Sequence, residues 1–203
     1  MSALPSRHRY LTRRLSYVLA ALLTAGALAA VDRAGLFGRP PAPDFETYDG
    51  KAFRVTGIVD GDTLDVDAPD RGSPHTRIRL WGVDTPETRK PNTPVQYYGP
   101  EATAFAKAAV MDQAVTLQLE RGQDPRDKYG RLLAFVILPD GRMLNRELIA
   151  QGYGYADPRF DHHLKREFHR LQQQAMSQRA GLWRQITQND LPYYYREKMK
   201  LPR

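Results

Sequence analysis

The sequence predicts an α+β domain in which a small β-barrel is packed against helices. Several short stretches alternate apolar and polar residues with the two-residue period of a strand. Asp, Gly and Pro residues, which favour turns, separate these stretches, and other segments show the helical spacing of apolar residues. Short strands joined by turns and accompanied by a few helices are typical of a barrel with covering helices.

Five segments are the candidate strands of this barrel. An Asp-Gly pair between apolar stretches favours a hairpin turn, so Asp60-Gly61-Asp62 is expected to join the first two. The last segment is a continuous apolar run, which is consistent with a central strand. In chain order the segments are Phe53–Val59, Thr63–Val66, Thr76–Trp81, Val115–Leu119 and Leu132–Leu138.

Three segments predict helices, because their apolar residues recur at intervals of three and four. Gly99-Pro100-Glu101 is a plausible start for the first of them. Gly152 and Gly181 follow the second and third, where a glycine commonly ends a helix. The segments are residues 102–110, 143–151 and 164–175.

The N-terminal region differs in composition from the rest of the chain. Residues 1–14 form a basic segment expected to remain cytoplasmic, and residues 15–31 are an apolar run that predicts a signal anchor or a cleaved signal peptide. Residues 32–51, rich in Pro and Gly, predict a tether. The domain at residues 52–184 and a C-terminal tail at residues 185–203 are then exported. They are anchored to the membrane if the leader is uncleaved, and secreted or periplasmic if it is cleaved.

The composition excludes some chemistries. The chain has no cysteine, which excludes a disulfide framework, a thiolate zinc site and a cysteine nucleophile. Its formal net charge is +7, but four of the 30 basic residues lie in residues 1–31, which hold no acidic residue. The other 26 basic residues face 23 acidic ones, a net of +3, which permits a polyanionic partner without requiring one. No feature of the sequence indicates an oligomer.

The stretch from Arg79 to Glu87 combines residue types suited to phosphate chemistry. Strand alternation points Arg79 away from the apolar face, and Pro86 stiffens the turn that follows the strand. Asp84 and Glu87 are thereby held close together, where oxygen ligands for a hard cation are easily gathered. A guanidinium group near two carboxylates suggests a site for a metal ion and a phosphate.

Two other stretches, Asp60–Thr63 and Asp127–Arg131, carry similar residue types. Taken singly, the first could be a turn and nothing more, and an isolated arginine is more often a surface charge than a phosphate ligand. In combination, the order and spacing of the stretches resemble the thermonuclease, or staphylococcal nuclease-like, family over residues 53–184. The matching stretches are Val59–Thr63, Arg79 with Asp84–Glu87, Tyr98–Ala102, Asp127–Arg131, Asn145 with Gln151-Gly152, and Ala180–Trp183.

The resemblance implies a fold and an activity. The fold is an OB-type five-stranded β-barrel with three packed helices, preceded in this chain by the N-terminal hydrophobic helix. The activity is that of a Ca²⁺-dependent endonuclease that hydrolyses phosphodiester bonds and leaves 5′-hydroxyl and 3′-phosphate ends. Nothing in the set of residues needs a ribose 2′-hydroxyl, so DNA and RNA are both expected as substrates.

The resemblance also implies roles for particular residues. Asp62 and Asp84 are similar to the carboxylate ligands of the calcium ion, and the Thr85 backbone carbonyl completes the protein's share. Glu87 resembles the general base or water-orienting residue. Ca²⁺ takes six to eight oxygen ligands, so this small set would leave positions for water and a substrate phosphate.

Further residues resemble the substrate contacts of the family. Arg79 and Arg131 correspond to two phosphate-binding arginines, which can stabilise the charge of the transition state. Tyr129 resembles a residue that hydrogen-bonds a nucleotide phosphate, and Lys128 beside it is a second candidate for substrate binding. A tyrosine at 153 or 155 could stack on a base or could equally belong to the core.

Two alternatives compete with these assignments. A catalytically silent OB-fold module at the cell envelope could bind nucleic acid or protein, although such a domain is expected to lose some of the implied catalytic residues, all of which are present. The histidines at 162, 163 and 169 suggest a metal site, but their spacing favours a solvated helix face. The run Tyr193–Tyr195, followed by Arg196, Lys198 and Lys200, could be a nucleic-acid contact, but a tail that is packed on the barrel or disordered is favoured.

Overall fold

The computed structural model describes residues 17–18, 22–24, 43–89 and 93–201. The chain forms two compact units, residues 1–42 and 43–203. The predicted hydrophobic helix at residues 15–31 lies outside the described residues, apart from 17–18 and 22–24, which are helical. In the part of the chain that the structure describes, no helix combines the length and apolar character required to cross a membrane.

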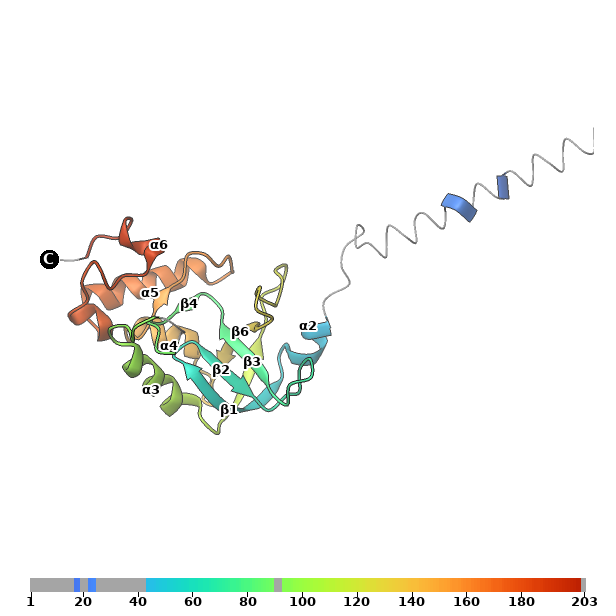
Figure 1. Cartoon of the computed structure of the whole chain (residues 1–203), viewed down its shortest axis with the longest axis horizontal. Helices are drawn as coiled ribbons and strands as arrows, with labels where there is room; N and C mark the ends of the chain where they lie inside the picture. The colour runs from blue at the N-terminus through green and yellow to red at the C-terminus, as the bar shows by residue number, and fades with distance from the viewer. Residues whose placement is uncertain (1–16, 19–21, 25–42, 90–92, 202–203) are drawn as a thin grey trace, which may run out of the picture. The chain divides into compact units, whose positions relative to one another are not determined.

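The second unit is built on a closed five-stranded barrel, as the sequence predicted (Figure 1). The strands follow one another around the barrel in the order β1, β2, β3, β6, β5. All neighbouring pairs are antiparallel except β3 and β6, which are parallel. The strands are β1 (Ala52–Asp60), β2 (Thr63–Val66), β3 (Thr76–Leu80), β5 (Ala114–Gln118) and β6 (Leu132–Ile137).

The barrel interior is filled by the apolar residues of these strands. Every residue of β6 except Ile137 is buried, which agrees with the continuous apolar run of its sequence. In β5 the buried residues Val115 and Leu117 alternate with more exposed ones, since successive side chains of a strand point to opposite faces. Fully buried members of this core include Val55, Leu64, Ile78, Leu80, Leu117, Leu132 and Phe135.

The three predicted helices are present and lie together beside the barrel (Figure 1). They are α3 (Gly99–Val110), α4 (Leu144–Ala150) and α5 (Lys165–Ser177). A small sheet, formed by β4 (Val83–Asp84) and β7 (Tyr155–Ala156), connects the end of the barrel to the helices. This sheet matters for the site, because it fixes Asp84 against the segment that precedes α5.

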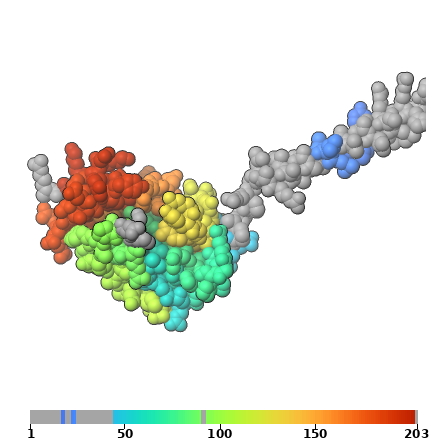
Figure 2. All heavy atoms as spheres, in the orientation of Figure 1, coloured from blue at the N-terminus to red at the C-terminus, as the bar shows by residue number. Residues whose placement is uncertain are grey.

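Two further short helices follow α5. The 3₁₀ helix η1 (Gly181–Arg184) and helix α6 (Tyr193–Arg196) pack through the buried residues Leu182, Trp183, Leu191 and Tyr195. Figure 2 shows the C-terminal residues, in red, at one end of the domain beside the green surface that includes α3. The C-terminal tail is therefore packed on the domain through residue 201, the last one described.

The structure corrects the boundary between tether and domain. Helix α2 (Pro43–Tyr48) belongs to the folded unit, which begins at Pro43 and not near Ala52. Tyr48 is buried, and its hydroxyl is 3.0 Å from the Thr76 hydroxyl. The Arg126 guanidinium forms ion pairs with Asp44 in α2 and with Asp70. These contacts are made by single side chains distant in sequence, so the proline-rich composition of the segment gave no sign of them.

The end of α4 approaches η1 at two glycines. Gly152 adopts a φ of +72°, and its carbonyl accepts a hydrogen bond from Leu182 N at 2.8 Å. A Cβ atom at Gly152 would overlap the carbonyl oxygen of Ala180, and a Cβ at Gly181 would overlap the carbonyl oxygen of Gly152. Only glycine permits so close a backbone contact.

The variant Gly152→Ala is therefore expected to destabilise the domain more than Gly50→Ala does. Gly50 has the same φ of +72°, but no atom lies within 4 Å of the position that a Cβ would occupy, so it reports the cost of the backbone conformation alone. We expect the free energy of unfolding, measured with urea, to fall by roughly 2 kcal/mol more in the Gly152 variant. Equal losses in the two variants would show that the contact with Ala180 is easily relieved.

Candidate active site

The centre of the candidate site is the guanidinium group of Arg79. Arg79 lies in β3 opposite Thr63 of β2, and this register places it beside the turn that carries Asp62. Its Nη1 is 3.1 Å from Asp62 Oδ2, and its Nη2 is 2.9 Å from Asp84 Oδ1. The side chain of Arg79 is only 6% exposed. The structure thus brings together two predicted metal ligands, Asp62 and Asp84, around the buried guanidinium of Arg79, which is a predicted phosphate ligand.

The turn before β2 is packed tightly against Thr85. The Thr85 backbone amide donates a hydrogen bond to Asp62 Oδ2 at 2.8 Å, while Asp62 Oδ1 accepts one from the Thr63 hydroxyl at 2.9 Å. A Cβ at Gly61 would come within 2.9 Å of the Thr85 side chain, so glycine is required in this turn. The Thr85 hydroxyl is buried and has no hydrogen-bond partner among the described residues.

The electrostatics of the site reflect several acids gathered in a buried place. Burial raises the pKa of Asp60 to about 7, and the negative charge of Asp62 adds to this effect. Burial also raises the pKa of Asp84 to about 6; Arg79 opposes the shift, while Asp62 contributes to it. Burial disfavours the charge of Arg79, but the carboxylates of Asp62 and Asp84 outweigh it and raise the pKa of that guanidinium. A further positive charge at this place would therefore stabilise the ionised carboxylates.

Glu87 lies outside this hydrogen-bonded cluster. It follows Pro86 in the segment after β4, is half-buried, and donates its backbone amide to Gln96 Oε1 at 2.9 Å. The Glu87 carboxylate makes no hydrogen bond or ion pair with any residue that the structure describes. A carboxylate held at its backbone and free at its oxygens can accept a proton from a water molecule.

Arg131 reaches the edge of the cluster through Thr63. Its Nη1 is 3.4 Å from the Thr63 hydroxyl, which in turn bonds Asp62, and its Nε donates to Asp127 Oδ2 at 2.8 Å. The ring of Tyr129, which is 73% exposed, lies 5.5 Å from the Arg131 guanidinium carbon and 5.0 Å from Lys128 Nζ. These residues of the loop before β6 form an exposed cationic and aromatic surface next to the site.

Two residues that sequence reasoning missed also contact Asp84. The Tyr194 hydroxyl, from α6, donates to Asp84 Oδ2 at 2.7 Å, and Arg159 Nη2 is 3.4 Å from Asp84 Oδ1. Asp157 holds Arg159 at 2.6 Å, and the Arg159 guanidinium lies 4.3 Å from the centre of the Tyr194 ring. Burial and the charge of Asp84 raise the pKa of Tyr194, so its hydroxyl keeps its proton and remains a donor. Because Tyr194 is distant from Asp84 in sequence, no local pattern could have found this contact.

The structure places both tyrosines against aromatic neighbours. Tyr155 is buried in β7, next to Trp183, and is therefore a core residue. Tyr153 is half-buried and stacks on Phe105 of α3, with ring centres 4.3 Å apart and an angle of 18° between the planes. Both rings are already packed against aromatic neighbours within the domain.

The expectation that the histidines lie on a solvated helix face is wrong for His162. This residue precedes α5 and is only 8% exposed, with its ring 5.6 Å from that of Phe135 and 4.9 Å from that of Phe168. Burial lowers the pKa of His162 to about 4, so the ring is neutral in the core. His163 does face solvent, where its Nδ1 is 2.5 Å from Glu120 Oε2. Among the described residues, no group of three or more His, Asp or Glu side chains is arranged to hold a metal ion.

Comparison with known proteins identifies the family of the chain. The family model described as "Staphylococcal nuclease homologue" matches residues 77–185. The chain is 39% identical over 107 residues to a thermonuclease of Staphylococcus intermedius, covering 53% of this chain and 60% of that protein. It is 37% identical over 134 residues to a thermonuclease of Staphylococcus hyicus, covering 66% and 76% respectively.

A third relative is an SPbeta prophage-derived endonuclease of Bacillus subtilis, 37% identical over 127 residues, or 62% of this chain and 41% of that protein. The family match covers more than half of the chain and includes most of β3, all of β4, the loop with Arg131 and all three long helices. The closed barrel, the Arg79 cluster and these matches lead to one conclusion: the chain belongs to the staphylococcal nuclease homologue family.

Proposed function

We propose that this protein is a Ca²⁺-dependent endonuclease that hydrolyses phosphodiester bonds of DNA and RNA. The observation that carries the proposal is the buried guanidinium of Arg79, held between the carboxylates of Asp62 and Asp84. A fixed guanidinium can donate to two oxygens of a phosphate, and an acidic environment keeps it charged. The names of the relatives, two thermonucleases and an endonuclease, support the same class of reaction.

The residues present fit a hard cation. Asp62 and Asp84 offer carboxylate oxygens, and the Thr85 backbone carbonyl would be the third protein ligand. Each carboxylate oxygen already accepts a hydrogen bond, but an ionised carboxylate has about four lone-pair sites, so lone pairs remain that could bind a metal ion. The unpartnered, buried hydroxyl of Thr85 is a further polar atom at this place. When bound, Ca²⁺ would neutralise phosphate charge and lower the pKa of a coordinated water.

Side chains of the protein would supply the remaining catalytic roles. Glu87 accepts a proton from the water that attacks phosphorus, because its carboxylate has no competing partner in the described structure. The new bond joins the water oxygen to phosphorus, and the bond from phosphorus to the 5′-oxygen breaks. The 5′-oxygen takes up a proton from solvent, and Glu87 returns its proton to solvent, so the products carry a 5′-hydroxyl and a 3′-phosphate.

The two arginines and the exposed loop would hold the substrate. Arg79 and Arg131 donate to the phosphate oxygens, where negative charge is stabilised as the reaction proceeds. Tyr129 and Lys128 extend this surface into solvent, which suits contacts with the phosphates that flank the reacting one. The reaction uses no sugar hydroxyl, so the proposal includes both DNA and RNA.

The test is cleavage of single-stranded DNA and RNA by the full chain, at millimolar Ca²⁺ and with a chelator. We expect cleavage only with Ca²⁺, and products whose 5′ ends can be phosphorylated directly by a polynucleotide kinase. A folded protein that binds these substrates but cleaves neither of them would contradict the proposal and support a catalytically silent binding module. Cleavage that persists in the chelator would refute the metal requirement.

We further propose that the domain is exported and held at the membrane by residues 15–31. The support is the basic N-terminal segment followed by the apolar run in the sequence. Fractionation of cells that produce the full chain would test this, with the anchored form in the membrane fraction. A shortened, soluble protein outside the cytoplasm would show that the leader is cleaved, and full-length protein in the cytoplasm would refute export.

The variant Tyr194→Phe tests whether α6 supports the candidate site. It removes the hydroxyl that donates to Asp84 Oδ2 and keeps the ring against Arg159. We expect the Ca²⁺ concentration at half-maximal rate to rise about tenfold, as is typical when a ligand loses its supporting hydrogen bond. Tyr193→Phe is the matched control, because the Tyr193 hydroxyl also accepts a hydrogen bond from Arg159, at 3.4 Å, but Tyr193 is 71% exposed and makes no hydrogen bond to Asp84. Identical Ca²⁺ dependence in the two variants would contradict the prediction.

A further inference from the structure

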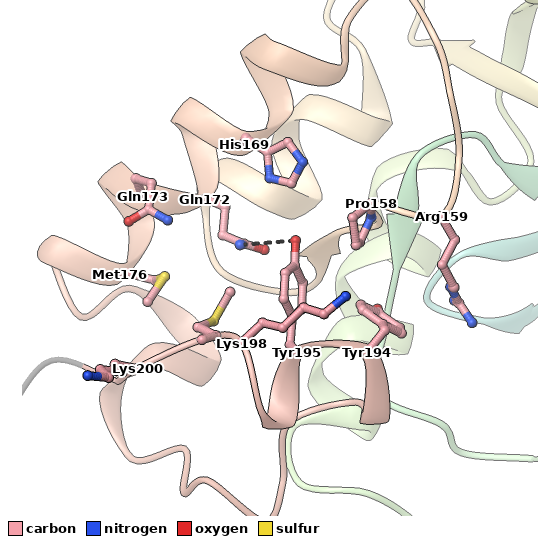
Figure 3. Close-up of a pocket in the computed structure, with 11 residues that line it drawn as sticks. Pro158, Arg159, His169, Gln172, Gln173, Met176, Tyr194, Tyr195, Lys198 and Lys200 are labelled. Atoms are coloured by element: carbon pink, nitrogen blue, oxygen red, sulfur yellow. Dashed lines mark hydrogen bonds between the residues drawn. The ribbon is translucent and has the colours of Figure 1, made fainter.

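A cavity of about 480 Å³ lies between α5 and the C-terminal segment (Figure 3). One wall comes from α5 and includes Gln172, while the opposite wall comes from residues 194–200. The volume is within the range of small-molecule binding sites in proteins. The family model ends at residue 185, so the wall formed by the C-terminal segment lies beyond the matched region.

The wall of the cavity is ordered by hydrogen bonds. Gln172 is almost fully buried, and its Oε1 accepts a bond from Ala156 N at 2.8 Å. Its Nε2 lies 3.4 Å from the Tyr195 hydroxyl, the contact drawn as a dashed line in Figure 3. The Tyr195 hydroxyl also donates to the Ala156 carbonyl oxygen. These bonds fix Tyr195 against α5, so the cavity does not depend on exposed side chains alone.

The charged side chains that line the cavity are all basic. They are Arg159, Lys198 and Lys200, and no acidic residue is among the lining. The charge of Arg159 is offset by Asp157 at 2.6 Å, whereas Lys198 and Lys200 form no ion pair with any described residue. Unpaired ammonium groups beside aromatic and amide side chains favour an anion that also has a planar, polar part.

The cavity shares a wall with the candidate active site. Arg159 and Tyr194 line the cavity, and the same two side chains contact Asp84. A nucleic-acid strand whose reacting phosphate lies at Arg79 would therefore have its continuation within reach of the cavity. Lys198 and Lys200 line the same cavity and could pair with a phosphate further along the strand.

We propose that this cavity is a substrate-strand subsite, which binds a nucleotide unit and its phosphate at a distance from the bond that is cleaved. The proposal rests on the proposed function, since it names the substrate as a single strand long enough to reach from Arg79 to Lys198. It assigns to the C-terminal segment the role of extending the contact with nucleic acid beyond the barrel.

Binding of fluorescein-labelled oligothymidylates of 3 and 12 nucleotides would test the subsite, measured by anisotropy in chelator at several salt concentrations. Two lysine contacts to a single strand correspond to a change of about 1.4 in the slope of log K against log salt. For the double variant Lys198→Ala/Lys200→Ala, we expect the slope of log K against log salt to be about 1.4 less steep than for the wild type. We also expect it to bind the 12-mer roughly 20-fold more weakly at 0.1 M salt. Its affinity for the 3-mer should stay unchanged.

The matched control is Lys51→Ala/Lys107→Ala, which removes the same charge from exposed positions that do not line the cavity. Equal loss of 12-mer affinity in both double variants would overturn the proposal, because the effect would then be one of net charge. A second outcome would also overturn the proposal. In it, inorganic phosphate raises the melting temperature of the wild type, but replacing Lys198 and Lys200 leaves the affinity for the 12-mer unchanged, so the cavity binds only free phosphate. The measurement needs no cleavage, so failure of the proposed catalysis leaves its result interpretable.

Discussion

The variant Glu87→Gln is expected to lower the rate of phosphodiester cleavage about 10³-fold, the usual contribution of a positioned general base. The free energy of unfolding should stay close to that of the wild type, because the Glu87 carboxylate bonds no described residue and its backbone amide bond to Gln96 is kept. Single-turnover cleavage of a DNA oligonucleotide at saturating Ca²⁺ measures the first quantity, and urea unfolding measures the second.

The control for this variant is Glu101→Gln. Glu101 is an exposed glutamate in the first turn of α3, and its replacement makes the same change of charge away from the Arg79 cluster. We expect this control to cleave at nearly the wild-type rate. If Glu87→Gln retains the wild-type rate as well, Glu87 is not the base, and the proton must be accepted by another group.

The variant Arg126→Leu is expected to cost roughly 3–5 kcal/mol of stability, the usual result when one partner of a buried ion pair is removed. The Arg126 side chain is 7% exposed and is held at 2.7 Å from Asp44 Oδ1 and 2.6 Å from Asp70 Oδ2. Its guanidinium carbon also lies 5.6 Å from the centre of the Tyr48 ring. Replacing it leaves Asp44 without its ion-pair partner and Asp70 with only the longer contact to Arg71 at 4.0 Å, and releases α2 from the barrel.

Urea unfolding with Arg142→Leu as the control would measure this effect. Arg142 also bonds two carboxylates, those of Asp140 and Glu147, but its side chain is 57% exposed, so solvent can replace the bonds. We expect the Arg142 variant to unfold near the wild-type urea concentration. Similar losses of stability in the two variants would show that burial does not distinguish these ion pairs. Proteolysis within residues 43–51 of the Arg126 variant would report the release of α2 directly.

The sequence was sufficient where the signal is local. The five strands and three long helices were predicted because the alternation and helical spacing of apolar residues record which side faces the core. The Asp-Gly turn before β2 and the strand that holds Arg79 were predicted for the same reason. The predicted start of the domain was wrong, since α2 is short and is held by Arg126 and Thr76, which lie far along the chain.

The features of the candidate site also fall into those that the sequence predicted and those that only the structure shows. The identity and order of Asp62, Arg79, Asp84 and Glu87 are properties of the sequence, and they were enough to indicate a family and a reaction.

Only the tertiary structure decided that Arg79 is buried between two carboxylates, that Glu87 stands outside their hydrogen bonds, and that Tyr194 supports Asp84. The physical reason is that strand pairing and packing set which side chains meet, and contacts such as that of Tyr194 with Asp84 join residues far apart in the sequence.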